Sequence, residues 1–175
     1  GATFHIPDAL KKAVEEYGDV IETVMFPYNI VETQAESLID QCAQKNIGFI
    51  DMKPLAGGAI DDAPLAIRFL MNNPNVTVAI PGMATVEEAE QNIRSAADNG
   101  PLTQQELEKI EKIRRELGTN FCRRCRYCEP CTAGISIYSV FLMEGYYRRY
   151  GLQEWAKARY DAMAKKASDC IGCGV

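Results

Sequence analysis

The first two thirds of the chain alternate between short apolar runs and stretches in which apolar residues recur every three or four positions. The apolar runs cover residues 20–26, 47–52 and 76–80, and a proline follows each of them within two positions. The runs begin 27 and 29 residues apart, which is a spacing typical of parallel strands joined by helices. Because the runs are apolar almost throughout, we expect both faces of the resulting sheet to be covered.

The periodic stretches predict helices. Thr85 with Glu88, and Thr103 with Glu106, have the spacing of a capping box, in which two side chains satisfy the first N–H groups of a helix. Two further helices, separated at Gly151, are expected in the last third of the chain. The expected helices cover residues 8–17, 34–46, 64–73, 85–98, 103–117, 136–150 and 153–166.

Two architectures have this alternation: an open doubly wound sheet and part of a (β/α)₈ barrel. The sequence contains no G-x-G-x-x-G dinucleotide motif. Small residues gather at 53–58 and 81–83, directly after two of the apolar runs. The carboxyl ends of parallel strands are where such folds hold their ligands, although turn formation alone would also explain these glycines.

Composition is that of a globular protein, and charge divides the chain in two. The 175 residues are 47% hydrophobic, and no apolar run reaches the roughly 18 residues of a membrane span. Residues 1–117 carry 10 Lys and Arg against 19 Asp and Glu, a net charge of −9, whereas residues 118–175 carry 9 against 5, a net charge of +4. We therefore expect two domains, 1–117 and 118–175. The first is too acidic to bind nucleic acid.

Six of the seven cysteines lie in the second domain at spacings typical of a metal site. A C-x₂-C-x₂-C spacing lets three thiolates converge on one face of an iron–sulfur cluster, which favours [4Fe–4S] over structural zinc. Disulfides are less favoured, because an acidic chain without a recognisable leader is expected in the reducing cytoplasm. Cys42 lies on an apolar helix face and is expected in the core. The predicted metal ligands are Cys122, Cys125, Cys128, Cys131, Cys170 and Cys173.

Five short segments occur in an order that resembles a known enzyme family. They are Gly1-Ala2-Thr3-Phe4-His5, Phe26-Pro27-Tyr28-Asn29, Lys53-Pro54-Leu55-Ala56-Gly57-Gly58, Ile80-Pro81-Gly82, and Asn92. With the cysteine tail they resemble the C-terminal half of an aldo/keto reductase barrel, in the branch that carries a C-terminal ferredoxin-like 4Fe–4S domain. The resemblance implies an α/β fold with about strands five to eight of a TIM barrel. A small helical, cysteine-rich ferredoxin-like domain, incomplete at its C-terminus, would follow.

The resemblance also implies a nicotinamide dinucleotide, NAD(P), at the ends of those strands. Thr3 matches the residue whose hydroxyl meets the nicotinamide carboxamide, and Asn29 closes the same shelf. The loop at 55–58 would approach the pyrophosphate through its backbone N–H groups. Pro81, Gly82 and Asn92 match the residues at the adenosine end. The implied cofactor-binding residues are Thr3, Asn29, Leu55, Ala56, Gly57, Gly58, Pro81, Gly82 and Asn92.

Departures from the family pattern limit this implication. Members that use NADP often have Lys and Arg where this chain has Gly82 and Glu88, so a strong NADP preference is in doubt. Met25 stands where a glutamine often contacts the carboxamide. The family's catalytic Tyr, Lys, Asp and His lie in the first half of the barrel and would precede Gly1. The sequence therefore predicts no catalytic residue in this chain, and the chain alone is expected to be inactive. His5 is interpreted as a structural residue.

The cysteine pattern also departs from a complete ferredoxin domain. In bacterial-type ferredoxins the fourth cysteine of each motif binds the other cluster. By that rule Cys131 would join Cys170 and Cys173 at a second cluster, and each cluster would lack one ligand. The six cysteines therefore suffice for one complete [4Fe–4S] cluster, for zinc, or for neither.

Two functions of different classes follow. The first is an oxidoreductase that couples hydride transfer between NAD(P) and a small carbonyl substrate to an iron–sulfur centre. An acidic electron carrier such as a ferredoxin or flavodoxin would dock on Arg123, Arg124 and Arg126. The alternative is a non-catalytic half-barrel with an iron–sulfur or zinc tail, which forms a homo-oligomer or pairs with a separate first half because two sheet edges are unpaired. Both are expected in the cytoplasm, with no nucleic acid or membrane partner.

Overall fold

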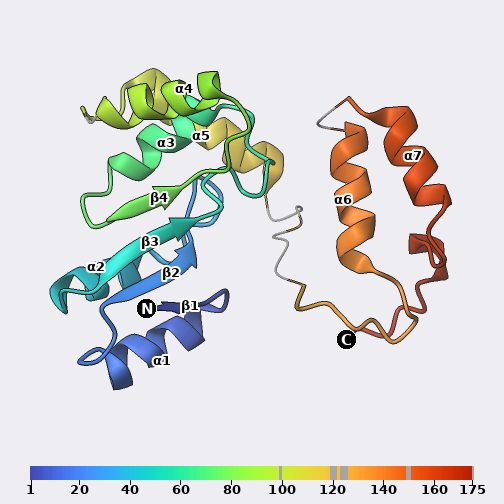
Figure 1. The fold of residues 1–175 in the computed structure, drawn as a ribbon, viewed down its shortest axis with the longest axis horizontal. Helices are drawn as coiled ribbons and strands as arrows, with labels where there is room; N and C mark the ends of the chain where they lie inside the picture. Colours follow the sequence, from blue (N-terminus) through green and yellow to red (C-terminus); the bar gives the residue numbers. More distant parts are fainter. Residues whose placement is uncertain (99, 119–121, 123–125, 149–150, 175) are drawn as a thin grey trace. The chain divides into compact units, whose positions relative to one another are not determined.

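The computed structural model describes residues 1–98, 100–118, 122, 126–148 and 151–174 (Figure 1). The chain divides into two compact units, Gly1–Thr119 and Asn120–Val175. The division falls within two residues of Gly118, where the net charge of the sequence changes sign. No helix in the described ranges is long and apolar enough to cross a membrane.

The first unit is built on a four-stranded sheet in which every described pairing is parallel. Helices α1 (Pro7–Tyr17), α2 (Glu36–Gln44) and α3 (Ala63–Met71) connect successive strands, so the predicted α/β alternation is confirmed. The strands are β1 (Ala2–Thr3), β2 (Thr23–Pro27), β3 (Gly48–Met52) and β4 (Val78–Ile80).

The strand order decides between the two architectures. The strands lie side by side in the order β1-β2-β3-β4, which is also their order in the sequence. A doubly wound sheet reverses its strand order at a switch point, whereas a (β/α)₈ barrel adds each strand beside the previous one. The first unit therefore has the topology of part of a barrel.

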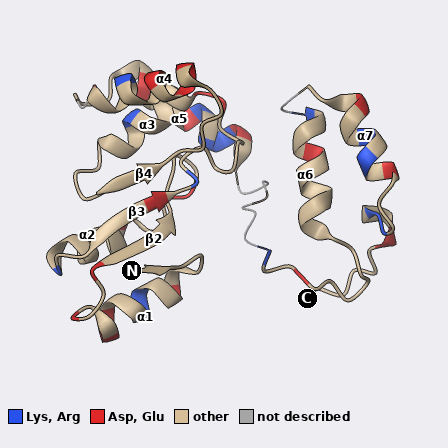
Figure 2. Cartoon of the chain, in the orientation of Figure 1, with Lys and Arg blue, Asp and Glu red and all other residues tan. Residues whose placement is uncertain are grey.

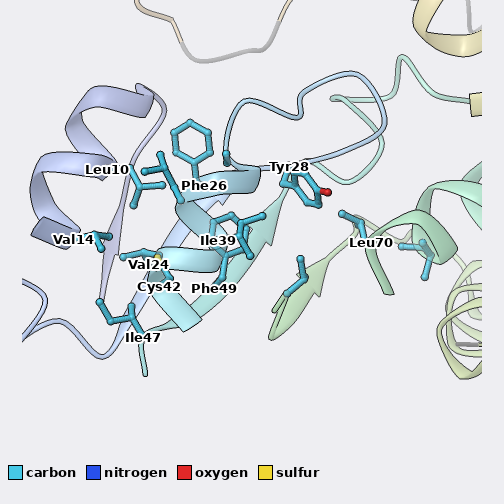
Figure 3. Close-up of a cluster of buried hydrophobic side chains, with 14 residues drawn as sticks. Leu10, Val14, Val24, Phe26, Tyr28, Ile39, Cys42, Ile47, Phe49 and Leu70 are labelled. Carbon is cyan, nitrogen blue, oxygen red and sulfur yellow. The ribbon is translucent and has the colours of Figure 1, made fainter. Parts of the chain in front are cut away.

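The core of the first unit packs α1, α2 and α3 against β2 and β3 (Figure 3). Leu10 comes from α1, Phe26 from β2, Phe49 from β3 and Leu70 from α3, and all are fully buried. Cys42 in α2 is also fully buried, which confirms its predicted place in the core. The burial raises the pKa of its thiol.

Two predicted strands are shorter than expected because turns occupy their first residues. The backbone N–H groups of Val20 and Ile21 both donate to the carbonyl of Tyr17, at 3.0 and 3.1 Å, so the chain is still turning at the end of α1. Val20 is 78% exposed. In the same way the N–H of Val76 donates to the carbonyl of Asn73, and β4 starts two residues later.

The expectation that both faces of the sheet are covered is wrong for β4. Val78 and Ile80 are each 44% exposed. Among the described strands β4 pairs with β3 alone, and the helix that follows it, α4 (Val86–Ala97), packs against α3. The last helix of this unit is α5 (Gln104–Leu117), and both α4 and α5 begin with the predicted capping boxes.

The second unit contains a helical hairpin. Helices α6 (Ile137–Arg148) and α7 (Gln153–Asp161) lie on either side of Gly151, as predicted, and pack together. Tyr146 meets Trp155 edge to face with ring centroids 5.1 Å apart. The second helix ends earlier than expected, and a short 3₁₀ turn, η1 (Ala167–Asp169), leads to Cys170.

Candidate functional site

The carboxyl ends of the four parallel strands bring most of the predicted cofactor-binding residues to one edge of the sheet (Figure 1). Thr3 ends β1, opposite Met25 of β2, and its side chain is exposed. Asn29 lies two residues beyond β2, and the loop that contains residues 55–58 follows β3. Pro81 directly follows β4. The sequence order of the segments thus becomes a spatial row along this edge.

The side-chain amide of Asn29 is used entirely by the protein. Its Nδ2 donates to Oε2 of Glu32 at 3.0 Å and to the carbonyl of Lys53 at 2.9 Å. Its Oδ1 accepts from the N–H groups of Val31 and Glu32, at 3.0 and 2.9 Å. An amide has two N–H donors and two acceptor sites, so all four are filled. Asn29 is fully buried, and its hydrogen bonds connect the end of β2 to the end of β3.

A buried carboxyl group lies beneath this connection. Asp51 in β3 is fully buried; its Oδ1 accepts from the N–H of Tyr28 at 2.8 Å, whereas its Oδ2 has no hydrogen-bond partner among the described residues. Burial, together with the nearby charge of Glu32, raises the pKa of Asp51 to about 8. Burial therefore favours the protonated, neutral form of Asp51.

The sequence analysis did not identify Asp51, Glu32 or Lys53 as residues of this edge. Asp51 does carry a signal, because it is the one charged position in the apolar run 47–52. Glu32 is also fully buried, but it follows β2 in a loop, where an acidic residue is usually exposed. Nothing in the local pattern distinguishes it from a surface residue.

The loop after β3 turns through several left-handed positions. Lys53 has φ 61° and Ala56 has φ 49°, which are rare values for residues with a side chain. Gly57 and Gly58, at φ 68° and 88°, adopt positive φ values without a steric penalty because they have no side chain. The N–H groups of Ala56 and Gly58 bond within the loop, to the carbonyls of Lys53 and Leu55, both at 2.8 Å. The loop is thus a compact turn directly above the end of β3.

A pocket of about 350 Å³ lies beside β4 and α4. Pro81 and Asn92, both predicted at the adenosine end of a cofactor, are among its lining residues, and most of the others are apolar. A Cβ atom placed on Gly82 would meet no other atom within 4 Å, so the space next to that residue is open. An apolar pocket with one amide in its wall suits a flat, largely apolar group with hydrogen-bonding edges.

The carboxylate of Glu88 covers the amino end of α4. Its Oε2 accepts from the N–H groups of Ala84 and Thr85, at 2.6 and 3.3 Å, and its own N–H donates to Oγ1 of Thr85. Figure 2 shows further acidic residues on the same helix. The Glu88 carboxylate thus binds the two N–H groups just before the helix and places negative charge where an anion would approach the helix start.

His5 follows β1 at the same edge of the sheet. Burial and the positive charge of Lys53 lower its pKa, and the charge of Glu32 acts in the opposite direction. His5 therefore lies within the electrostatic range of residues that follow both β2 and β3. Its interpretation as a structural residue stays a prediction.

Five of the six predicted metal ligands are among the residues that the structure describes. The sixth, Cys125, lies outside them, and so do Arg123 and Arg124, which are predicted to contact an electron carrier. None of the other cysteines forms a disulfide with a described residue. The two cysteine motifs meet at one point, where Oγ1 of Thr132 lies 3.2 Å from Sγ of Cys173. The N–H of Gly172 also lies 3.5 Å from Sγ of Cys170.

The donor chemistry of these thiols fits an iron–sulfur cluster or zinc, and their geometry fits only in part. Within the described residues, no three side chains of Cys, His, Asp or Glu come together as a metal site would require. The contact between Thr132 and Cys173 nevertheless brings the end of the first motif to the second, as a shared site would require. Arg126 stacks on the ring of Tyr138, with its guanidinium carbon 4.7 Å from the ring centre.

Comparison with known proteins relates the first unit to one enzyme family. Residues 61–115 match the profile of the aldo/keto reductase family. An uncharacterized oxidoreductase from Schizosaccharomyces pombe is 29% identical over 105 residues, which are 51% of this chain and 34% of that protein. The chain thus spans about a third of the length of this curated relative.

The aldo-keto reductase AKR11C1 from Bacillus halodurans has a similar fold. Its holo form matches with a TM-score of 0.53 at 15% identity, over 65% of this chain and 49% of that chain. Its apo form matches with a TM-score of 0.51 at 16% identity, over 63% and 49% of the two chains. At these identities the likeness concerns the fold, and it spans about half of that reductase. The profile match thus relates residues 61–115 to the aldo/keto reductase family, and the structural likeness shows that the chain shares part of the fold of such a reductase.

Proposed function

We propose that this chain is part of an NAD(P)-dependent oxidoreductase of the aldo/keto reductase type that acts on a small carbonyl substrate. Its first unit would hold the cofactor. The observation that carries this proposal is the row of Thr3, the loop after β3, and Pro81 along the carboxyl edge of one parallel sheet. In barrel enzymes this edge holds the active site.

The nicotinamide dinucleotide would supply the hydride, and the described residues would bind and orient it. The exposed hydroxyl of Thr3 would bond the carboxamide. In the loop at 55–58, Ala56 and Gly58 use their N–H groups within the turn, so the N–H groups of Leu55 and Gly57 would face the pyrophosphate. The pocket lined by Pro81 and Asn92 would take the adenosine. Asn29 would act through the loop that it holds, since its amide has no remaining donor or acceptor.

Glu88 supports a preference for NAD over NADP. Its carboxylate occupies the start of α4, where a 2′-phosphate would need positive charge and free N–H groups. The phosphate would instead meet a like charge.

The second unit would add an iron–sulfur centre, with zinc as the alternative metal. Thiolates at C-x₂-C spacing suit either metal, and the Thr132–Cys173 contact supports a site that draws on both motifs. A [4Fe–4S] cluster transfers single electrons, which an acidic carrier protein such as a ferredoxin or flavodoxin would exchange with it. The cationic side chain of Arg126 in this unit is suited to such a partner.

Titration calorimetry with NADH and NADPH tests the first half of the proposal. We expect NADH to bind the 175-residue chain and NADPH to bind more weakly. Lack of binding by either dinucleotide would contradict the cofactor role of the first unit.

Anaerobic reconstitution with iron and sulfide, followed by metal analysis, tests the second half. We expect a broad absorption band at about 400 nm and about four irons per chain. Cys173→Ser should lower the iron content, whereas Cys42→Ser, in the core of the other unit, should leave it unchanged. Stoichiometric zinc with no such band would favour the non-catalytic alternative.

A further inference from the structure

The helical hairpin of the second unit has an open groove between its two helices. The groove has a volume of about 440 Å³, which is within the range of small-molecule sites. On α6 the lining residues recur every three or four positions, so one face of that helix forms one wall. Ala156 of α7 lines the groove and is only 1% exposed, so it forms part of the floor. The groove belongs to a different unit from the candidate cofactor edge.

The walls of the groove are mainly apolar and aromatic. Val140, Met143 and Tyr147 line it from α6, and Tyr160 lines it from α7. Tyr147 is 46% exposed, so the hairpin leaves nearly half of this side chain uncovered. Two aromatic rings in one groove suit a ligand with a flat or extended apolar body.

The wall on α7 is held by the segment that follows this helix. The hydroxyl oxygen of Tyr160 accepts from the N–H of Ala167, at 3.0 Å, and Ala167 begins η1. Nζ of Lys166 donates to the carbonyl of Asp161, the last residue of α7, at 3.1 Å. These bonds restrict the Tyr160 ring before any ligand binds, which lowers the entropic cost of binding. The groove therefore borders the segment that leads to Cys170.

Three charged side chains also line the groove, and two of them form an ion pair. Nε of Arg148 lies 3.0 Å from Oε1 of Glu144, one turn earlier on α6. The third, Lys157 on α7, is exposed, and its ammonium has no hydrogen bond or ion pair with a described residue. Within the described part of the chain, the groove thus presents one uncompensated positive charge beside its apolar walls.

We propose that this groove binds an amphipathic carboxylate, whose apolar body contacts Tyr147 and Tyr160 and whose carboxylate pairs with Lys157. Charge complementarity selects the sign of the ligand, because a cation would meet Lys157 while Glu144 is already paired with Arg148. A neutral apolar ligand would cover the same walls but gain no charge-assisted hydrogen bond. The site requires neither the dinucleotide nor the metal of the proposed function.

An NMR titration of the full chain with phenylbutyrate and with octanoate tests this site. We expect both acids to shift the amide signals of α6 and α7, with a dissociation constant of about 1 mM or lower. One acid has an aromatic body and the other an aliphatic body, so the tighter binder identifies the body that the groove prefers. Absence of these shifts with both acids, or shifts confined to the first unit, would overturn the proposal.

Lys157→Gln tests the role of the charge. We expect it to weaken phenylbutyrate binding about threefold, an effect typical of an exposed ion pair, because Lys157 is exposed on its helix. Binding of phenylbutanol, the uncharged analogue, should stay unchanged, and Lys157→Arg should keep most of the affinity for the acid. Lys165→Gln, at an exposed lysine that does not line the groove, is the matched control. Equal losses in the Lys157→Gln and Lys165→Gln variants would show nonspecific charge attraction and overturn the assignment of Lys157.

Tyr147→Ala tests the apolar wall. We expect it to weaken binding of the acid and of the alcohol alike, by about tenfold, because both ligands lose the same ring contact. Phe141→Ala is the matched control, since Phe141 also lies on α6 and is 45% exposed but does not line the groove. Circular dichroism identifies any variant that loses its helices. Equal effects of the two substitutions would contradict binding in this groove.

Discussion

At the residue scale, Asp51 combines complete burial with a carboxyl oxygen that has no described partner. The folded state holds its pKa at about 8, against 3.8 for an ordinary aspartate, mainly because burial disfavours the charged form. A raised carboxyl pKa means that the folded state binds the proton more tightly than the unfolded state. The stability that this provides is complete below about pH 4 and declines as the pH rises to about 8.

Asp51→Asn should therefore remove most of this pH dependence. The amide oxygen still accepts from the N–H of Tyr28, and no charge can form at the buried position. We expect the variant to be more stable than the native chain at pH 9 by about 1–3 kcal/mol, and the difference to shrink toward pH 5. Urea unfolding followed by circular dichroism at both pH values measures this. An equal pH dependence in the two proteins would show that Asp51 ionises normally.

Glu88 gives a second prediction at this scale. Glu88→Arg replaces the carboxylate at the start of α4 with a cation, so it should raise the affinity for NADPH relative to NADH by about tenfold. The change also removes half of the capping box, which should lower stability by about 1 kcal/mol. Glu87→Arg, on the first turn of the same helix, is the control. A similar gain in that variant would mean that net charge alone sets the preference.

At the element scale, Arg68 of α3 connects that helix to the start of α5. The guanidinium of Arg68, 11% exposed, bonds both carboxylate oxygens of Glu106 and also pairs with Asp98, at 2.7 Å. The hydrogen bonds from Arg68 hold the pKa of Glu106 down at about 2. Glu106 is at the same time the capping-box partner of Thr103 at the start of α5. The Glu106 carboxylate thus caps the start of α5 and also bonds this helix to α3.

Glu106→Gln should destabilise the chain at pH 7 by about 2 kcal/mol, because Arg68 loses one of its two charged partners. A lowered carboxyl pKa adds stability above the unfolded value of about 4.5, and that contribution disappears as the pH falls toward 2. The difference in stability between the variant and the native chain should therefore shrink steadily as the pH falls from about 4.5 toward 2. Thermal unfolding from pH 7 to pH 2.5 gives the measurement, with the exposed Glu108→Gln on the same helix as control. A constant difference across this range would assign the effect to packing alone.

Elements whose ends are determined by nearby residues could be predicted from the sequence. Thr85 and Thr103 with their partners determine where α4 and α5 begin, and the structure has both capping boxes. Apolar runs gave the strands but not their first residues, because Val20 is as apolar as a strand residue although it lies in a turn. The hydrogen bond from Asn29 to the carbonyl of Lys53 could not be predicted, since it joins positions 24 residues apart that only the sheet brings together.

At the scale of the whole molecule, β4 is an edge strand of the described sheet, with exposed apolar side chains on it and after it. Among the described strands β4 pairs on one side only. Ile80, at 44% exposure, Met83 at 51% and Ile93 at 69% lie on or after this strand. Exposed strand edges pair readily with other chains, and apolar neighbours strengthen such contacts. We therefore expect the 175-residue chain to associate with itself as its concentration rises.

Light scattering over a concentration series measures that association. Ile80→Lys places a charge on the open edge, where lysine opposes edge pairing, so it should shift the chain toward the monomer. Val20→Lys is the matched control, because Val20 is more exposed, at 78%, but lies in the turn before β2 rather than on the edge strand. If edge pairing drives association, the first variant reduces the average mass and the second does not. A native chain that stays monomeric at high concentration would show that the β4 edge is protected in solution, and equal effects of both lysines would point to general charge repulsion.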